Sequence, residues 1–350
     1  MPTHKIDQQR SESPKTAHPR RGFRVGLGLI GITILSSAVG ALLAVSSSTT
    51  PLLQRSLTPE EAAVFRKGDS LTRSSLQLPE LTRPVHILVM GMSVLTTDIR
   101  NSPRETQHLR YNAQVNSFDG LSDVMLLFRF DPESKKVNIL SIPRDTRVLM
   151  NGYGVIKINS ANVEGGPAAS ARIVNQLLGD VPIDRYLRVN VQGVQKLVEA
   201  LGGVTVYVPK DMKYQDESQH LYINLKEGKQ HLNGEQTLQL LRFRHDQDGD
   251  IGRIERQQMV MRALMEQTLN LQTVARLPQI LSVIESSLDT NLSVEELVAL
   301  AGFAVKIDRS KVQMLTLPGE VNGDGRSNVS YWLPDYRRIH EMMVQYFGEE

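Results

Sequence analysis

Cysteine is absent from this chain of 350 residues, which excludes disulfide bonds, thiolate metal sites and a cysteine nucleophile. An excess of charge of one sign is also missing, because 40 lysines and arginines balance 38 aspartates and glutamates to a net charge of +2. Nucleic-acid-binding proteins usually show a strongly basic face, so this balance argues against nucleic acid as a partner.

Three common catalytic motifs are missing as well. The chain has no GxSxG sequence and neither form of the P-loop, GxxxxGKS or GxxxxGKT. Their absence argues against an α/β-hydrolase nucleophile and a P-loop nucleotide site. The histidines show no HExxH spacing, so a zinc enzyme is not expected.

Long apolar runs are rare, and the chain has one, VGLGLIGITILSSAVGALLAV at residues 25–45. It carries no charge and as a helix would be roughly 30 Å long, enough to cross a bilayer. Basic residues outnumber acidic ones in residues 1–24, which places the N-terminus in the cytoplasm. A cleaved signal peptide is the alternative, but the long polar lead favours an uncleaved anchor. We expect a single-pass plasma-membrane protein whose folded part is extracytoplasmic.

The rest of the chain divides into a linker and a folded body. We expect a cytoplasmic basic tail, a transmembrane helix, an extracytoplasmic linker with at most one short helix, a main domain and a C-terminal α/β extension. In that order they occupy residues 1–24, 25–45, 46–83, 84–275 and 276–350.

A hairpin is the clearest local signal. Two apolar strands, 124–130 and 137–142, flank the turn sequence DPESKK. If the hairpin is symmetric about its turn, Asp123 lies opposite Arg144; a bulge would shift this pairing by one residue. The strands are almost entirely apolar, which predicts burial on both faces.

Strand and helix patterns alternate along the remaining body. Asn233 is a candidate N-cap, with Gln236 at the capping-box position. The mixture predicts a three-layer α/β/α sandwich with a mixed central sheet. Expected strands are 85–91, 185–191, 204–208, 221–225 and 312–317, and expected helices are 167–178, 194–201, 234–241, 253–271, 278–304 and a terminal one from 335.

Charge is most concentrated in LRFRHDQDGDIGRIERQQ, residues 241–258. Arg242 and Arg244 would share a face of an extended stretch, and Arg253 and Gln257 would share a face of a helix. Arg253 is expected in the first helical turn, where a cation is unfavourable unless an anion is bound nearby. Arginine forks match phosphate oxygens in pairs. The alternative is a salt-bridged surface of Arg244, Asp248, Asp250 and Arg256.

Two further segments carry charge at strand ends. In SIPRDTR, Arg144 follows a buried strand, and in FDGLSD, Asp119 and Asp123 lie in a turn before one. Mg²⁺ takes one or two carboxylates together with phosphate oxygens and water, so the aspartates are candidate ligands. The alternatives are a polar strand exit, with Asp145 capping a turn, and a simple glycine turn.

Several segments together resemble the LytR–CpsA–Psr family, and the resemblance covers roughly residues 85–270. The segments are SDVMLLFRFDPESKKVNILSIPRDTRV, KINSAN, IDRYLRVNVQGVQKLVEALGGV, LNGEQTLQLLRFRH and DIGRIERQQ. The resemblance implies an α/β/α sandwich with an apolar tunnel for a lipid tail. It also implies a phosphotransferase that moves a glycan polymer from a polyprenyl-pyrophosphate carrier to peptidoglycan, typically to the muramic acid 6-hydroxyl.

The resemblance also implies roles for individual residues. Asp123 would hold Mg²⁺, and the pyrophosphate would be bound by the motif residues of the other segments. These residues are Arg144, Lys157, Arg242, Arg244, Arg253 and Gln257, with Asp123, Arg144, Arg242 and Arg244 taken as catalytic.

The chain departs from the family pattern in two places. Leu121 stands where the family often has arginine, in GRSD, and Ser93 stands where it often has the aspartate of G-x-D. Asp119 is therefore the expected second magnesium ligand, with Asp98 as the alternative. Within enzymes, a pyrophosphatase that uses water as acceptor is the rival function; a non-catalytic polyprenyl-lipid-binding regulator is the rival of another class.

Overall fold

Residues 48–350 form one compact unit. The computed structural model describes residues 57–66, 71–73, 79–92, 118–216, 221–243, 249–268, 273, 276–322 and 330–348. The expected basic tail and the apolar run at 25–45 lie outside these residues. No helix in the described part of the chain is both long and apolar enough to span a bilayer.

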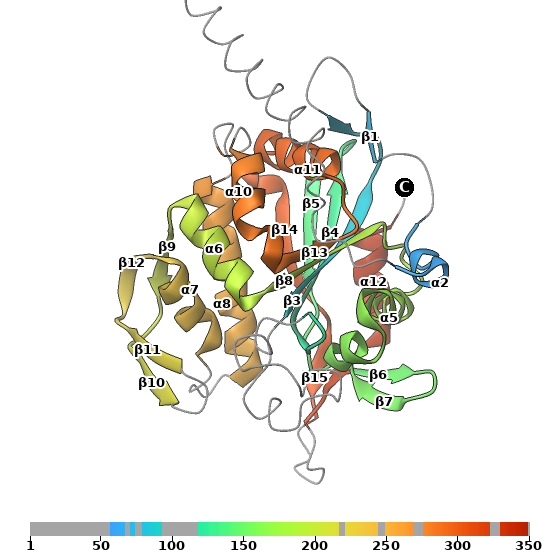
Figure 1. Ribbon diagram of the computed structural model, residues 1–350. Helices are drawn as coiled ribbons and strands as arrows, with labels where there is room; N and C mark the ends of the chain where they lie inside the picture. Colours follow the sequence, from blue (N-terminus) through green and yellow to red (C-terminus); the bar gives the residue numbers. More distant parts are fainter. Residues whose placement is uncertain are drawn as a thin grey trace, which may run out of the picture. The chain divides into compact units, whose positions relative to one another are not determined.

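A six-stranded mixed sheet forms the centre of the unit (Figure 1). β4 pairs with β3 and β5 on either side, antiparallel to both, whereas β8 runs parallel to β3 and β14 parallel to β5. The strand order is β13 (Leu288–Thr290), β8 (Arg185–Asn190), β3 (Val85–Met92), β4 (Ser122–Asp131), β5 (Lys136–Ser141) and β14 (Val312–Thr316).

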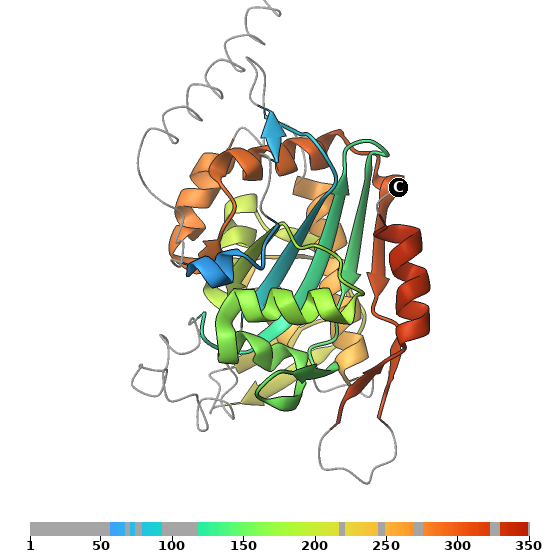
Figure 2. The ribbon, with the colours of Figure 1, turned by 90° about the vertical axis from the view of Figure 1, so that its right-hand side faces the viewer.

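Helices cover both faces of the sheet, which makes three layers (Figures 1 and 2). On one face, Met125 and Leu127 of β4 pack in a core with α5 (Ala161–Leu177) and α12 (Tyr336–Tyr346). On the other face, partly buried Phe128 and Phe130 of β4 pack with α8 and α11 (Val294–Lys306), while α10 covers β8 and β13. Alternate side chains of β4 therefore pack into two different cores, one on each face of the sheet, as predicted.

A smaller core lies beside the sheet. Two antiparallel hairpin-like pairs, β9 with β12 and β10 with β11, pack their apolar side chains against helices α6, α7 and α8. The elements are α6 (Val191–Leu201), β9 (Val204–Val208), β10 (Met212–Asp216), β11 (Leu221–Leu225), β12 (Gly228–Leu232), α7 (Gly234–Arg242) and α8 (Gly249–Thr268).

Helix termini agree with the capping signals in the sequence. Asn233 Oδ1 accepts a hydrogen bond from the Gln236 backbone N–H, and Gln236 Oε1 accepts one from the Asn233 backbone N–H, so the predicted capping box is confirmed. α8 begins at Gly249, four residues before the expected start.

Residues on both sides of the expected main domain, 84–275, pack into the same cores or the same sheet. The predicted linker, 46–83, contains α2 (Pro59–Ala62), and its Phe65, Leu71 and Leu81 are buried in the cores, so folding begins well before residue 84. The predicted C-terminal extension is not separate either, because β13 and β14 are strands of the central sheet. Leu288–Thr290 also divides the expected helix 278–304 into α10 (Leu277–Ile284) and α11, since this buried segment pairs with β8.

Candidate active site

A β-bulge positions Asp123 at the end of the sheet. Gly91 pairs with Val124, but the next residue of β3, Met92, pairs with Ser122, so Asp123 is the extra residue. Bulges re-aim a side chain and leave the extra residue's backbone outside the ladder. Glycine suits position 91, because an added Cβ would lie 2.9 Å from the Val124 Cβ. Asp123 is buried, and its carboxylate contacts the side chain of Arg144.

Arg144 meets Asp123 across the β4–β5 hairpin. The observed register pairs Leu126 with Ser141, which continued by three residues sets Asp123 opposite Arg144. The Arg144 Nη1 donates to Asp123 Oδ1 at 2.9 Å. The predicted pairing is confirmed, because the hairpin itself is regular and the bulge lies on the other side of β4.

Asp145 and Lys157 extend this ion pair. The Arg144 Nε lies 3.5 Å from Asp145 Oδ2, and the Lys157 Nζ lies 2.6 Å from Asp145 Oδ1. β6 (Arg147–Met150) and β7 (Gly154–Lys157) form a hairpin that returns the chain, so Lys157 arrives beside Asp145. The ammonium also lies 5.9 Å from the centre of the Tyr331 ring.

Arg253 reaches the same place from α8. Its Nη2 donates to the backbone oxygen of Asp123 at 2.6 Å, and the side chain is buried. The bulge makes this possible, since the Asp123 carbonyl points away from the ladder with β3. Arg253 is the fifth residue of α8 and lies in the second turn, so its expected position in the first turn is wrong.

Among the residues that the structure describes, the assembled cluster has more cationic than anionic groups. It contains the carboxylates of Asp123 and Asp145 and the charges of Arg144, Lys157 and Arg253. The side chains of Arg144 and Lys157 are 17% and 32% exposed, so part of the cluster faces solvent. Partly desolvated guanidinium and ammonium groups form strong hydrogen bonds to phosphate, so the site suits a phosphate-bearing ligand.

In the R-F-R segment, the middle residue Phe243 contacts a buried arginine. Arg242 is the last residue of α7, so its expected place on an extended stretch is wrong; Arg244 lies outside the described residues. Arg256 donates to the Phe243 backbone oxygen at 2.6 Å and stacks on its ring at 5.8 Å. Arg256 is buried, and its partners in the alternative salt bridge, Arg244, Asp248 and the side chain of Asp250, lie outside the described residues.

The remaining predicted residues have less defined partners. Gln257 is half-buried on α8, and its neighbour Gln258 donates to the hydroxyls of Ser141 and Thr316. Asp119 lies exposed in the turn before β4. Ser93, Asp98 and the side chain of Asp250 lie outside the described residues.

The protein side chains alone do not make a magnesium site, but Asp123 could bind Mg²⁺ together with the phosphates of a bound ligand. In the described residues, no three His, Cys, Asp or Glu side chains come together as an all-protein metal site. The cluster does offer the Asp123 carboxylate, one oxygen of which contacts Arg144. Mg²⁺ keeps several waters and uses one or two carboxylates with substrate phosphates, and Asp123 meets that requirement.

Sequence reasoning missed a further buried arginine near the site, Arg188. Arg188 of β8 pairs with Asp289 of β13 and also donates to the Phe118 backbone oxygen and to Asn162 Oδ1. The Asn162 amide in turn donates to the backbone oxygens of Phe118 and Gly120. This network fixes the turn that precedes Ser122 and Asp123. Arginine in a strand of alternating burial was the available clue.

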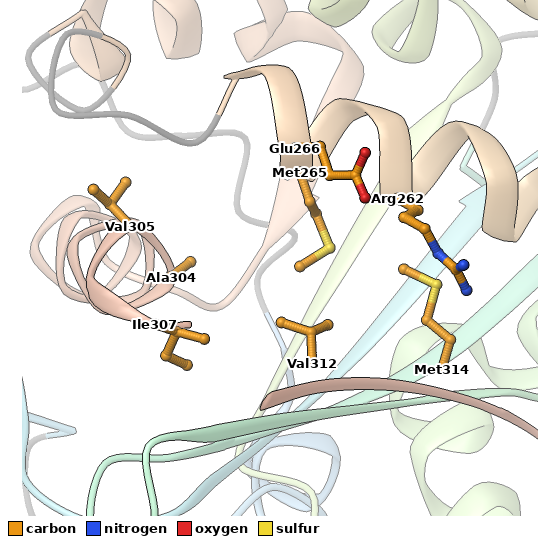
Figure 3. A pocket seen from close by; sticks show the side chains of 8 residues that line it. All are labelled: Arg262, Met265, Glu266, Ala304, Val305, Ile307, Val312 and Met314. Carbon is orange, nitrogen blue, oxygen red and sulfur yellow. The ribbon is translucent and has the colours of Figure 1, made fainter. Parts of the chain in front are cut away.

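A packed layer of apolar side chains runs from the site along the sheet. Val124, next to Asp123, belongs to the same cluster as Leu126 and Phe128 on the face toward α8 and α11. At its far end a cavity of about 390 Å³ lies between these helices and β14 (Figure 3). Met265, Val312 and Met314 point into it, with Arg262 and Glu266 at its edge.

Comparison with known proteins links this arrangement to one family. The model of the LytR_cpsA_psr family matches residues 56–347. "Polyisoprenyl-teichoic acid–peptidoglycan teichoic acid transferase TagV" of Bacillus subtilis is 32% identical over 230 residues, 64% of this chain and 58% of that protein. "Regulatory protein MsrR" of Staphylococcus aureus is 34% identical over 200 residues, 56% of this chain and 59% of that protein. The chain thus spans less than two thirds of either relative.

Solved structures show the same fold. The crystal structure of B. subtilis TagV superposes with a TM-score of 0.60 at 28% identity, covering 75% of this chain and 96% of that one. A structure of TagT bound to LIIa-WTA gives a TM-score of 0.58 at 22% identity, covering 75% of this chain and 89% of that one. At that identity the TagT structure supports the fold alone.

Proposed function

Because the chain belongs to the LytR–CpsA–Psr family, we propose that it is a phosphotransferase of cell-envelope assembly. It would move a glycan polymer from a polyprenyl-pyrophosphate carrier to peptidoglycan, at the 6-hydroxyl of muramic acid. The name of TagV, a teichoic acid transferase, supports this reaction class. The observation that carries the proposal is the convergence of Arg144, Lys157 and Arg253 on Asp123 and Asp145.

The proposed reaction needs positioned charge more than covalent help. The acceptor oxygen bonds to the phosphorus nearest the glycan, and the bond from that phosphorus to the bridging oxygen breaks. Polyprenyl phosphate leaves with the electron pair, and the acceptor hydroxyl gives up its proton to a base. Charge grows on the bridging oxygen, so preorganised cations lower the barrier.

The chain's own cations would supply this charge. Arg144 and Lys157 face the open side of the cluster and would bind the two phosphates, together with Arg242 and Arg244. Arg253 would hold the bulged backbone of Asp123 from behind. A bound magnesium ion would supply further positive charge to the phosphates, with Asp123 as its protein ligand.

Two carboxylates are candidates for the proton acceptor. Asp145 is held by Lys157 at 2.6 Å and by Arg144 at 3.5 Å, which favours a role in orienting these cations. Asp250 is the other candidate.

The apolar layer between β4 and helices α8 and α11, with the cavity at its far end, would receive the lipid tail. It begins at Val124, next to Asp123, and continues along β4 toward the cavity at Met265 and Met314. A polyprenyl chain needs such an apolar layer because burial of apolar groups is its main source of binding energy. The apolar run at 25–45 would tether the site to the membrane that carries the donor and raise the effective donor concentration.

A regulator that binds lipid without catalysis is the second candidate, supported by the name of MsrR. A pyrophosphatase is the third. Purified full-length chain, Mg²⁺, a lipid-linked glycan donor and peptidoglycan fragments separate the three. The proposal expects glycan joined covalently to peptidoglycan together with polyprenyl phosphate. Free phosphorylated glycan would instead indicate a pyrophosphatase, and an unchanged donor in the presence of binding would indicate a regulator.

A further inference from the structure

The β6–β7 hairpin, whose backbone is drawn in Figure 1, exposes several large apolar side chains beside the site. Leu149 is 67% exposed, Tyr153 52% and Val155 42%. Leu149 and Val155 are direct cross-strand partners and therefore share one face of the hairpin. Val148 and Ile156 form the next pair and pack into the main core on the opposite face. The hairpin is thus anchored by one face and presents the other outward.

The outward face changes from basic to apolar along its length. Arg147 pairs with Lys157 at the base, two residues from Leu149 and Val155, and so lies on the same face. Lys157 at that base also contacts Asp145 of the site. From Arg147 to the turn the hairpin is about 10 Å long at roughly 3.4 Å per residue. The basic end is therefore at the site and the apolar end projects beyond it.

We propose that this face inserts into an anionic lipid bilayer, with Leu149, Tyr153 and Val155 at the acyl-chain boundary and Arg147 among the headgroup phosphates. Interfacial amphipathic elements bury their apolar side to about 5–10 Å, which matches the length of the hairpin. Tyrosine favours the membrane interface, and arginine is attracted to anionic lipid. Leucine and valine side chains offer no hydrogen bonds to a glycan, which favours acyl chains over peptidoglycan as the partner.

This inference rests on the proposed function and adds to it. With the hairpin inserted, Lys157 and Arg144 lie near headgroup depth, where the diphosphate of a membrane-borne donor is found. The site then meets its donor at the bilayer surface before the lipid tail enters the protein.

The absence of cysteine allows a clean depth measurement. Leu149→Cys and, as control, Val344→Cys on α12, which is 65% exposed, are each labelled with a nitrobenzoxadiazole fluorophore. The labelled full-length chains are placed in nanodiscs of phosphatidylglycerol and phosphatidylcholine. The label at 149 is expected to be quenched by doxyl-labelled lipid and protected from iodide, and the label at 344 to behave in the opposite way. Equal iodide access at both positions overturns the proposal.

Two additions identify the partner. Arg147→Glu is expected to reduce the protection at 149 in phosphatidylglycerol nanodiscs and to change it little in pure phosphatidylcholine. Peptidoglycan fragments are then added: protection of the 149 label that appears only with these fragments would assign the face to the acceptor and overturn membrane insertion.

A functional experiment separates this inference from the proposed reaction. The double variant Leu149→Asp/Val155→Asp is expected to lower transfer from a long-chain donor in nanodiscs about tenfold, and to leave transfer from a short-chain soluble donor unchanged. Equal loss with both donors contradicts the inference. If the wild-type chain transfers from neither donor, the proposed function fails, while the quenching result still decides the position of the hairpin.

Discussion

Two arginine–aspartate pairs lie at the same end of the central sheet and differ in their surroundings. The side chains of Arg188 and Asp289 are 2% and 4% exposed, and Arg188 also donates to Phe118 and Asn162. Those of Arg144 and Asp123 are 17% and 7% exposed, and Arg144 is next to a further carboxylate, Asp145. We call Arg188 and Asp289 the sealed pair, because they are buried and Arg188 also donates to neutral oxygens. We call Arg144 and Asp123 the open pair, because Arg144 is partly exposed to solvent.

The difference separates a structural use of arginine from a ligand-binding use. The Arg188 guanidinium is matched by one carboxylate and by oxygens of the chain, so its charge is compensated inside the fold. At the open pair, three cationic groups meet two carboxylates among the described residues, and Arg144 and Lys157 are partly exposed to solvent. We therefore expect loss of the sealed pair to damage stability and loss of the open pair to damage activity.

The largest effect is expected at the open pair. Arg144→Ala should lower transfer by about 10³-fold, as removal of a preorganised charge from a transition state does, while the unfolding midpoint stays close to that of wild type. Arg144→Lys should recover little, since an ammonium cannot bind two oxygens as a fork. Transfer from a lipid-linked donor is measured beside Arg172→Ala, an exposed arginine of α5. Wild-type rates in Arg144→Ala, or in Arg244→Ala, would reject the assignment.

The sealed pair should respond in the opposite way. Arg188→Ala leaves Asp289 buried and is expected to cost about 3–5 kcal/mol of unfolding free energy. The double variant Arg188→Met/Asp289→Leu should be less destabilised, because neither charge is then left alone. Urea unfolding of the full-length chain checks both. An Arg188→Ala chain with wild-type stability would mean that the two pairs do not differ in the way described.

A smaller effect is expected at the edge of the open pair. Tyr331 contributes a ring 5.9 Å from the Lys157 ammonium, a partly exposed cation–π contact worth about 0.5–1 kcal/mol. Tyr331→Leu should therefore raise the KM for the donor about two- to fivefold with little change in kcat. Tyr331→Phe keeps the ring and should behave as wild type. A loss of kcat shared by both variants would show that the hydroxyl or the local fold matters instead.

An effect of similar size concerns a third arginine–aspartate pair, Arg129 and Asp131, at the other end of β4. Burial acts to raise the pKa of Asp131, but hydrogen bonds from Ser134 and Glu133 and the charge of Arg129 outweigh it and hold the pKa below its usual value. A lowered pKa adds stability above the unfolded pKa of about 4 and loses it as the pH falls through the folded value.

Asp131→Asn should therefore cost about 1 kcal/mol at pH 7, and the difference from wild type should shrink below about pH 4. Urea unfolding at both pH values measures it. A difference that is the same at pH 7 and pH 3 would show that the carboxylate charge is not the cause.

The sequence predicted the parts of the site that depend on local geometry. The turn DPESKK fixes the centre of the β4–β5 hairpin, and a regular register then pairs Asp123 with Arg144. Asn233 and Gln236 marked the start of α7, because both capping partners lie within four residues. Such features need only neighbouring residues and standard strand or helix periods.

Features made by distant residues could not be predicted in this way. Arg188 finds its partners 26, 70 and 101 positions away along the chain, so its strand pattern alone did not show whether it is buried. The bulge at Asp123 depends on the close approach of Gly91 from another strand. The start of α8 lies in a segment rich in charge and glycine, where periodicity is weak, and Arg253 was therefore placed one turn too early in the helix.

The central claim is that cations distant in the sequence bind one doubly phosphorylated lipid head. A crystal structure of the chain with geranylgeranyl pyrophosphate and Mg²⁺ tests it most directly. The account predicts both phosphates within hydrogen-bonding distance of Arg144 and Lys157, the metal on Asp123, and the tail along Val124 and Leu126. A diphosphate bound on another surface, with this cluster unchanged, would contradict it.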